Sequence, residues 1–305
     1  MKGTILVTGA NGFIGRHVSQ AAALQGNQVI GIGHGDWTEE TWRRWGLSAW
    51  HELDVTVASL LAHVRTPDLV VHCAGSSSVG FSFENPAQDF DRTVLTTVEV
   101  LEYIRTCAPE TALVYPSSAA VYGQAATLPI TEDSPLNPIS PYGVHKKMAE
   151  DLCRSYSESF GVRVAIVRLF SAYGVELRKQ LLWDACRKAV SDDYQFAGTG
   201  RETRDWVNAE DIARLLLIAG DHAGSHAPIV NGASGNEVAI QTILSVLFEA
   251  LGTSREPEFS GSGRPGDPER YAGDPSRALA WGWAPQRPWR EGVQEYARWF
   301  REVAS

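Results

Sequence analysis

The chain contains 305 residues, 44% of them hydrophobic, and its 27 Lys and Arg residues stand against 36 Asp and Glu residues, a formal net charge of −9. A chain of this length exceeds the size at which one hydrophobic core stops growing, so we expect a large domain with a smaller lobe. The negative balance, with no basic stripe to offset it, argues against a nucleic acid or an anionic membrane as a partner.

Short apolar runs of strand character alternate with helix-length segments through the first half of the chain. The runs lie at residues 4–7, 28–32, 69–72, 112–115 and 163–169. Buried strands that alternate with helices are typical of a parallel sheet covered on both faces. We therefore predict an α/β fold with a doubly wound parallel sheet of Rossmann type over residues 1–170.

A glycine-rich turn follows the first predicted strand. Gly9, Gly12 and Gly15 open a helix directly after the apolar run. Glycines at these positions allow backbone N–H groups to approach a pyrophosphate at a helix N-terminus. The motif therefore predicts a dinucleotide-binding site.

Tyr142 and Lys146 are separated by four residues, a spacing that places both side chains on one face of a helix. The Lys146 ammonium is expected to lower the pKa of the Tyr142 phenol toward neutrality. Such a tyrosine can exchange a proton with a carbinol oxygen while a nicotinamide exchanges hydride with its carbon. Ser118, after the fourth predicted strand, would hold the same oxygen.

The composition changes after residue 170, where we place a smaller lobe that closes on the substrate. A charged helical segment, 177–191, is followed by a Gly-rich turn at 198–200 and by Pro- and Gly-rich stretches from 257 to 288. The strand-like run DWVN and a helix from Glu210, capped by Asn208, are expected to return to the main sheet. The predicted lobe therefore comprises 171–202 and 233–305, and 203–232 belongs to the first domain.

Eight motifs occur in an order that resembles one enzyme family, the extended short-chain dehydrogenase/reductases of the NAD-dependent epimerase/dehydratase type, which act on nucleoside-diphosphate sugars. They are TGANGFIG (8–15), HELDV (51–55), VVHCAG (70–75), the Ser118/Tyr142/Lys146 set, RLFSAYG (168–174), RETRDWVNAEDIA (201–213), RPGDP (264–268) and GDPSRALAWGWAP (273–285). A single glycine motif would be weak evidence, whereas eight in the family's order are specific.

The resemblance implies a set of site residues. The expected cofactor contacts are Gly9, Asn11, Gly12, Phe13, Ile14, Gly15, Gly33, His34, Asp54, Val55, Ala74, Gly75, Tyr142, Lys146 and Phe170. The expected substrate contacts are Ser76, Ser77, Ser118, Ser171, Arg204, Arg264 and Asp267. The two arginines would grip the diphosphate or the nucleotide ribose, and His72 would support the cofactor loop. The resemblance also implies a nucleoside-diphosphate sugar as substrate and a homodimer formed through the helices after Asp89 and Tyr142.

Two alanines reduce the number of reactions that the protein is expected to catalyse. Sugar 4,6-dehydratases of this family carry an acid and a base directly after the catalytic Ser or Thr, and the decarboxylases keep the Glu. This chain has Ala119 and Ala120 there, which cannot transfer a proton. A 4-keto-sugar reductase or a 4-epimerase remains. A nucleotide-binding relative without activity is disfavoured because Ser118, Tyr142 and Lys146 are all present.

The end of the second predicted strand bears on the cofactor. NAD-dependent members commonly place an Asp there for the adenosine ribose, whereas this chain has Gly33. Gly33 followed by His34, with Arg16 nearby, leaves room and positive charge for a 2′-phosphate, so NADP(H) is favoured, and NAD(H) stays open through Asp36. NADPH suits a net reductase, so the reductase is our main prediction and an NAD-dependent 4-epimerase is the alternative.

Further differences from the family leave the nucleotide of the substrate undetermined. Ser171 replaces the Asn that contacts the diphosphate in most relatives, so UDP, dTDP, GDP and CDP sugars all remain. Thr93 and Thr96 replace an Asn and a Gly that are usual in the family, and the sequence does not explain these two changes.

The four cysteines, Cys73, Cys107, Cys153 and Cys186, lack metal-like spacing, which indicates reduced thiols and no metal site. No run of eighteen apolar residues occurs, and we expect a cytoplasmic protein.

Overall fold

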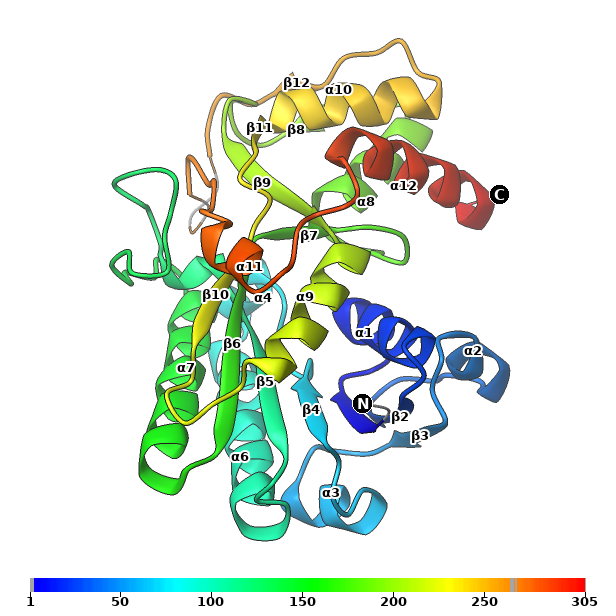
Figure 1. Ribbon diagram of the computed structural model, residues 1–305. Helices are drawn as coiled ribbons and strands as arrows, with labels where there is room; N and C mark the ends of the chain where they lie inside the picture. Colours follow the sequence, from blue (N-terminus) through cyan, green and yellow to red (C-terminus); the bar gives the residue numbers. More distant parts are fainter. Residues whose placement is uncertain (1–2, 264–265, 267, 305) are drawn as a thin grey trace.

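A seven-stranded parallel sheet forms the centre of the computed structural model, which describes residues 3–263, 266 and 268–304 (Figure 1). The strand order is β10-β6-β5-β4-β1-β2-β3. The strands are β1 (Thr4–Thr8), β2 (Gln28–Gly33), β3 (Ala49–Glu52), β4 (Leu69–His72), β5 (Ala112–Ser118), β6 (Arg163–Leu169) and β10 (Ile229–Gly232). The order reverses between β1 and β4, and ligands of such sheets bind outside the carboxyl ends of the strands at this point.

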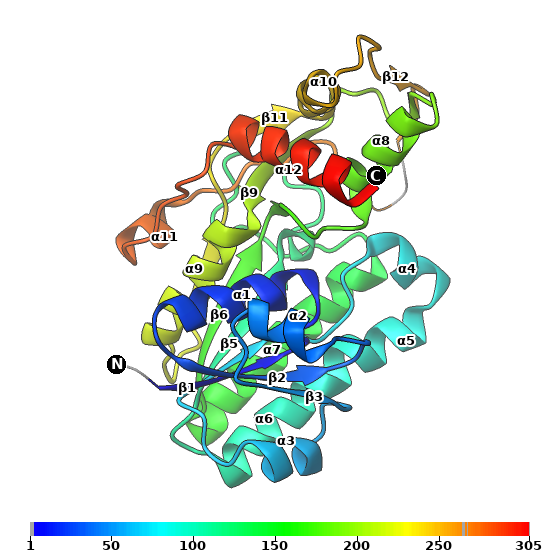
Figure 2. The ribbon, with the colours of Figure 1, turned by 90° about the vertical axis from the view of Figure 1, so that its right-hand side faces the viewer.

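Helices cover both faces of the sheet because the strands bury residues on both sides. Along β1, Ile5 and Val7 pack into one core with α1 (Phe13–Leu24) and α9 (Ala209–Asp221). Leu6 packs into the opposite core with α3 (Val57–His63), α6 (Thr96–Cys107) and α7 (Pro141–Phe160). Figure 2 shows α1 on one side of β1–β3 and α3 and α6 on the other. This arrangement confirms the predicted doubly wound fold.

Short segments complete the sheet domain around the carboxyl ends of the strands. They are α2 (Glu39–Arg44), α4 (Val79–Glu84), α5 (Pro86–Phe90), the π-helix η1 (Asp91–Leu95) and the 3₁₀ turn η2 (Ala119–Val121).

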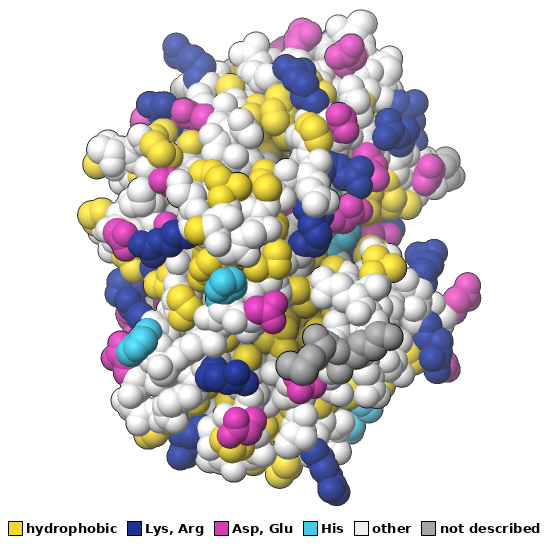
Figure 3. Space-filling model, viewed as in Figure 1, with side chains coloured by type: hydrophobic (Ala, Val, Ile, Leu, Met, Phe, Trp, Pro, Cys, Tyr) yellow, Lys and Arg dark blue, Asp and Glu magenta, His cyan; other side chains and the backbone are white. Residues whose placement is uncertain are grey.

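Among the described residues, no helix has both the length and the apolar character needed to cross a membrane. On the face in Figure 3, basic and acidic side chains are interspersed.

A third hydrophobic core lies above the sheet in Figure 1, between α8, α10 and α12. Its elements are β7 (Ser171–Tyr173), α8 (Gln180–Val190), β8 (Gln195–Phe196), β9 (Thr203–Asn208), β11 (Glu237–Ala239), α10 (Ile240–Leu251), β12 (Glu258–Phe259) and α12 (Trp289–Ala304). The short helix α11 (Ser276–Ala280) packs instead into a core of the sheet domain through Ala278. We propose that this third, separate core forms the smaller lobe predicted from the sequence.

The strand DWVN differs from its predicted place. It lies in β9, which pairs with β7 and β11 in a three-stranded sheet, and not in the main sheet. Trp206 packs into the core of the lobe while Val207 packs into the core of the sheet domain, so β9 connects the two. β10 takes the edge of the main sheet. The predicted cap is present, because Asn208 accepts a hydrogen bond from the Glu210 N–H at 2.9 Å.

Candidate active site

The glycine-rich turn between β1 and α1 forms a cradle that side chains would fill. Gly9 adopts a φ of +65°, and a Cβ there would lie 2.6 Å from the Ala74 backbone nitrogen. A Cβ on Gly15 would lie 2.3 Å from the Gly9 carbonyl oxygen. The N-cap of α1 is Gly12, which supplies no side-chain cap to the first N–H groups of the helix. The turn therefore fits a dinucleotide, whose pyrophosphate these N–H groups would bind.

The loop after β4 is held by two threonines. Thr8 Oγ1 hydrogen-bonds to His72 Nδ1 at 2.7 Å and accepts the Ala74 N–H at 3.2 Å. Burial lowers the pKa of His72 to about 3, so its ring is neutral. Thr93 Oγ1 accepts the Ser76 N–H at 3.3 Å. The sequence left Thr93 without an account, and the structure shows that it fixes the loop that carries Ser76 and Ser77.

Ser118 and Tyr142 meet at the carboxyl end of β5. Their side chains lie beside each other, close enough for the Ser118 hydroxyl to affect the pKa of Tyr142, and Ser118 Oγ accepts the Ala120 N–H at 3.2 Å. Tyr142 lies in the first turn of α7, whose N-cap Ser140 accepts the Gly143 N–H at 3.2 Å. The structure thus brings together a serine and a tyrosine that are separated by 24 residues in the chain.

Lys146 lies one turn further along α7 and is buried. Its Nζ donates to the Pro116 carbonyl at 3.0 Å and lies 4.8 Å from the centre of the Tyr115 ring. Burial lowers the pKa of Lys146 to about 8. Burial also raises the pKa of Tyr142 to about 12, and the neighbouring Ser118 hydroxyl opposes this rise. The predicted depression of the Tyr142 pKa by Lys146 is therefore absent here, because the ammonium faces Pro116 and burial dominates.

His34 and Asp54, two of the predicted cofactor contacts, lie at the carboxyl ends of β2 and β3. His34 Nε2 contacts Asp54 Oδ1 at 2.9 Å, and both side chains are exposed. Arg16 does not supply free positive charge here, because its guanidinium pairs with Glu176 at 3.0 Å and donates to the Asn11 carbonyl at 2.7 Å. The structure therefore lends no support to the part of the NADP(H) prediction that rested on Arg16.

The other predicted cofactor residues lie around this edge or behind it. Gly33 ends β2, and Phe170 packs between the rings of Tyr122 and Tyr271, 6.4 and 5.9 Å away between ring centres. At the start of α1 and in the loops after β3 and β4 are Asn11, Phe13, Ile14, Val55, Ala74 and Gly75. Contacts of these residues with a cofactor stay a prediction.

The predicted substrate residues come from both parts of the molecule. Ser77 Oγ accepts a hydrogen bond from Lys179 Nζ at 2.5 Å, a contact across the two parts that the sequence did not indicate. Arg204 Nη1 donates to the Pro268 carbonyl at 2.8 Å, and Ser171 opens β7. Arg264 and Asp267 lie outside the described residues.

These features define a class, a dinucleotide-dependent oxidoreductase on a Rossmann fold. The chain belongs to the NAD dependent epimerase/dehydratase family, whose model matches residues 5–232. This match confirms the family and the enzyme class, an extended short-chain dehydrogenase/reductase, that the motifs indicated.

Relatives match over nearly the whole chain. A UDP-glucose 4-epimerase of Mycolicibacterium smegmatis is 28% identical, over 97% of this chain and 98% of that protein. A UDP-glucuronate 4-epimerase of Thermodesulfobacterium geofontis is 26% identical, over 98% and 97%. The solved UDP-glucuronic acid 4-epimerase of Bacillus cereus, in complex with UDP-glucuronic acid and NAD, is 25% identical with a TM-score of 0.88, over 98% of this chain and 99% of that one.

Proposed function

We propose that the protein is an NAD-dependent 4-epimerase of UDP-sugars. The observation that carries this proposal is that Ser118 and Tyr142 lie beside each other, with two alanines where dehydratases and decarboxylases of the family carry an acid and a base. This set can move a proton at a C4 oxygen and has no group there to eliminate water. The relatives named above are 4-epimerases, which favours the alternative over the reductase that we predicted first.

The choice of NAD over NADP(H) has two supports. Arg16, the cation invoked for a 2′-phosphate, is neutralised by Glu176. The solved Bacillus cereus relative was obtained with NAD. The reductase prediction depended on a preference for NADPH. Without support for that preference, the reductase loses its main argument.

Tyr142 is the proton acceptor in the proposed reaction. When bound, NAD would accept a hydride from C4, return it to the opposite face, and bring a positive charge that favours the Tyr142 phenolate. Tyr142 takes the proton of the C4 hydroxyl and later returns it to the C4 oxygen. Ser118 donates a hydrogen bond to that oxygen, and the Lys146 ammonium adds positive charge behind the pair. Because the proton returns to the sugar, no net acid or base is consumed.

The test is product analysis with UDP-glucose and NAD. We expect UDP-galactose to form without a stoichiometric rise in NADH absorbance, and NADP to support much less turnover. UDP-glucuronate is assayed in parallel, because the relatives include 4-epimerases of both sugars. Stoichiometric consumption of NADPH by a 4-keto sugar, without epimerisation, would instead restore the reductase.

We further propose a homodimer through η1 and α7. Leu95 on η1 and Val144 and Met148 on α7 are 48%, 41% and 40% exposed, and the two α7 residues lie one turn apart on one face. Apolar side chains gathered on an open helix pair are typical of a subunit interface. We expect Val144→Glu/Met148→Glu to elute as a monomer in size-exclusion chromatography, whereas Val190→Glu, at an exposed apolar residue on α8, elutes as the wild type does. A monomeric wild-type protein would contradict the proposal.

A further inference from the structure

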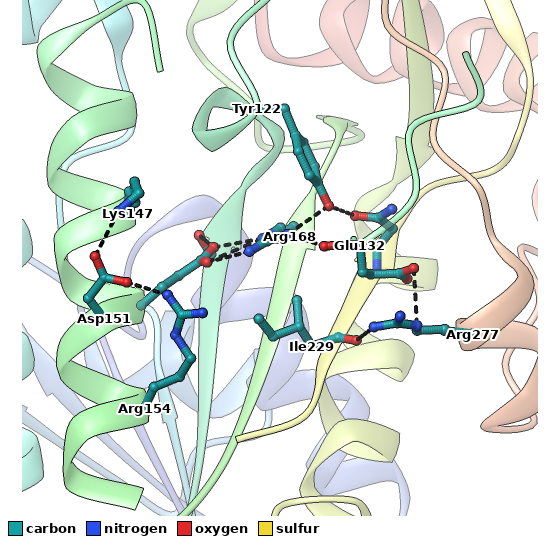
Figure 4. A network of polar contacts seen from close by, with 11 residues as sticks. Tyr122, Glu132, Lys147, Asp151, Arg154, Arg168, Ile229 and Arg277 are labelled. Atoms are coloured by element: carbon teal, nitrogen blue, oxygen red, sulfur yellow. Dashed lines mark hydrogen bonds and ion pairs between the residues drawn. The ribbon is translucent and has the colours of Figure 1, made fainter. Parts of the chain in front are cut away.

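A buried ion pair lies directly behind the candidate catalytic residues. Arg168 on β6 and Glu150 on α7 have exposed fractions of 1% and 0%. Arg168 Nε donates to Glu150 Oε1 at 3.0 Å and Nη2 donates to Oε2 at 2.7 Å, so the pair is bidentate. Figure 4 shows Arg168 at the centre of this network, between α7 and Tyr122. A buried ion pair adds little stability compared with apolar packing, so stability alone does not explain it.

The pair fastens both ends of the segment that carries Ser118. Ser117 Oγ donates to Glu150 Oε1 at 2.5 Å, on the residue before Ser118. Arg168 Nη1 donates to the Tyr122 hydroxyl at 3.0 Å, four residues after Ser118. The β5–β6 register places Ser117 directly beside Arg168. Ser118 is thus held between two anchor points on a single ion pair.

The same pair fixes the helix that carries the other two catalytic candidates. Glu150 follows Lys146 by four residues and Tyr142 by eight, so all three share one face of α7. The bond from Arg168 to Glu150 therefore sets the rotation of α7 about its axis relative to β5 and β6. Tyr122 is fixed in turn, because its hydroxyl donates to Asn231 Oδ1 on β10 at 2.7 Å.

We propose that the Arg168–Glu150 pair, with Ser117, is the positioning element that aligns Ser118 on β5 with Tyr142 and Lys146 on α7. None of these three residues has to touch the substrate. They act through the catalytic residues, and a displacement of about 1 Å at a reacting group can cost on the order of a hundredfold in rate. The expected kinetic effect rests on the proposed epimerase function, whereas the alignment itself does not.

Two variants and a control test the proposal. Ser117→Ala removes one anchor and leaves the ion pair intact, so no buried charge loses its partner. Glu150→Gln keeps the shape of the side chain but removes its charge, and it leaves Arg168 unpaired, which destabilises the fold. Ser157→Ala is the matched control: Ser157 is also buried on α7, and its hydroxyl donates to the Gly224 carbonyl at 3.0 Å, near the far end of the helix.

We expect kcat with UDP-glucose to fall about tenfold in Ser117→Ala and about a hundredfold in Glu150→Gln, with KM and NAD affinity within about twofold of the wild type. Ser157→Ala should keep the wild-type kcat. A kcat for Ser117→Ala within about twofold of wild type, or an equal loss in Ser157→Ala, would overturn the proposal. If Glu150→Gln does not fold, Ser117→Ala alone decides.

A second readout separates this proposal from the function proposed above. If the wild type turns over no UDP-sugar, the proposed function fails, and the alignment is then read from crystal structures of the wild type and Ser117→Ala with NAD. We expect Ser118 Oγ to move relative to the Tyr142 hydroxyl by at least about 0.5 Å, the tolerance of a functional site. An unchanged position would overturn the positioning role.

Discussion

Replacement of Tyr142 by Phe is expected to lower kcat by about three orders of magnitude, within the range of general acid–base catalysis. The variant keeps the ring and loses the hydroxyl that exchanges the proton of the C4 hydroxyl. Ser118 does not replace it, because an aliphatic hydroxyl without a base beside it is a poor proton acceptor. The fold and NAD affinity should be nearly unchanged, since the variant loses one hydroxyl and keeps the aromatic ring, and the net contribution of one polar contact to stability is about 1 kcal/mol.

The matched control for this variant is Tyr194→Phe. Tyr194 is 6% exposed, and its hydroxyl contacts Thr253 Oγ1 at 3.2 Å in the smaller lobe. Both variants lose one tyrosine hydroxyl, but only Tyr142 lies beside Ser118. Single-turnover and steady-state assays with UDP-glucose measure the difference. Turnover by Tyr142→Phe at a rate near that of Tyr194→Phe would remove Tyr142 from the chemistry.

Local patterns were sufficient to predict most of the sheet and the cofactor turn. The runs in β1, β2, β4, β5 and β6 are continuous and apolar because both faces of the sheet are covered. The glycines of the first turn and the spacing of Tyr142 and Lys146 are also local features, within one strand-to-helix turn and one helical turn. The short edge strands β3 and β10, with the sequences AWHE and IVNG, carry weaker patterns and are not among the apolar runs that we identified in the sequence.

The features that sequence reasoning missed depend on contacts between distant residues. β9 looks like a main-sheet strand, and only its pairing with β7 and β11 shows that it belongs to the separate three-stranded sheet. Arg16 meets a carboxylate 160 residues away, and Arg168 meets one 18 residues away on another element. Periodicity in the sequence does not indicate such contacts between distant residues. The part of the cofactor prediction that rested on Arg16 is therefore without support, because the sequence shows a cation but not its partner.

The environment of Lys146 could not be predicted either. The sequence indicates on which face of the helix Lys146 lies, but not how deeply the side chain is buried. The residue is 7% exposed, and burial lowers the pKa of its ammonium from 10.5 to about 8. Asp89 and Glu150 favour the charged form but do not offset the desolvation. A group held charged at a buried site destabilises the fold, and catalytic sites commonly carry such groups at a cost in stability.

We therefore expect Lys146→Met to be inactive and more stable than the wild type. The variant loses the charge behind Tyr142, so kcat should fall by about two orders of magnitude or more. A pKa lowered from 10.5 to about 8 corresponds to about 3 kcal/mol of destabilisation in the charged form. The variant also loses the hydrogen bond to the Pro116 carbonyl, which costs about 1 kcal/mol. The free energy of unfolding should therefore rise by about 2 kcal/mol in the variant.

The pH dependence of this gain provides the sharpest test. Because the folded-state pKa lies below the unfolded-state value, the native state disfavours the proton, and the destabilisation in the wild type is complete below about pH 8. It disappears as the pH rises through about 10.5, where both states lose the proton. Urea unfolding of the wild type and Lys146→Met without cofactor should therefore show the largest advantage of the variant at pH 7. The advantage should shrink as the pH rises and be lost before about pH 10.5, where only the missing hydrogen bond to the Pro116 carbonyl separates the two proteins. A less stable Lys146→Met variant at pH 7 would show that the Lys146 ammonium, although buried, is well compensated by its neighbours.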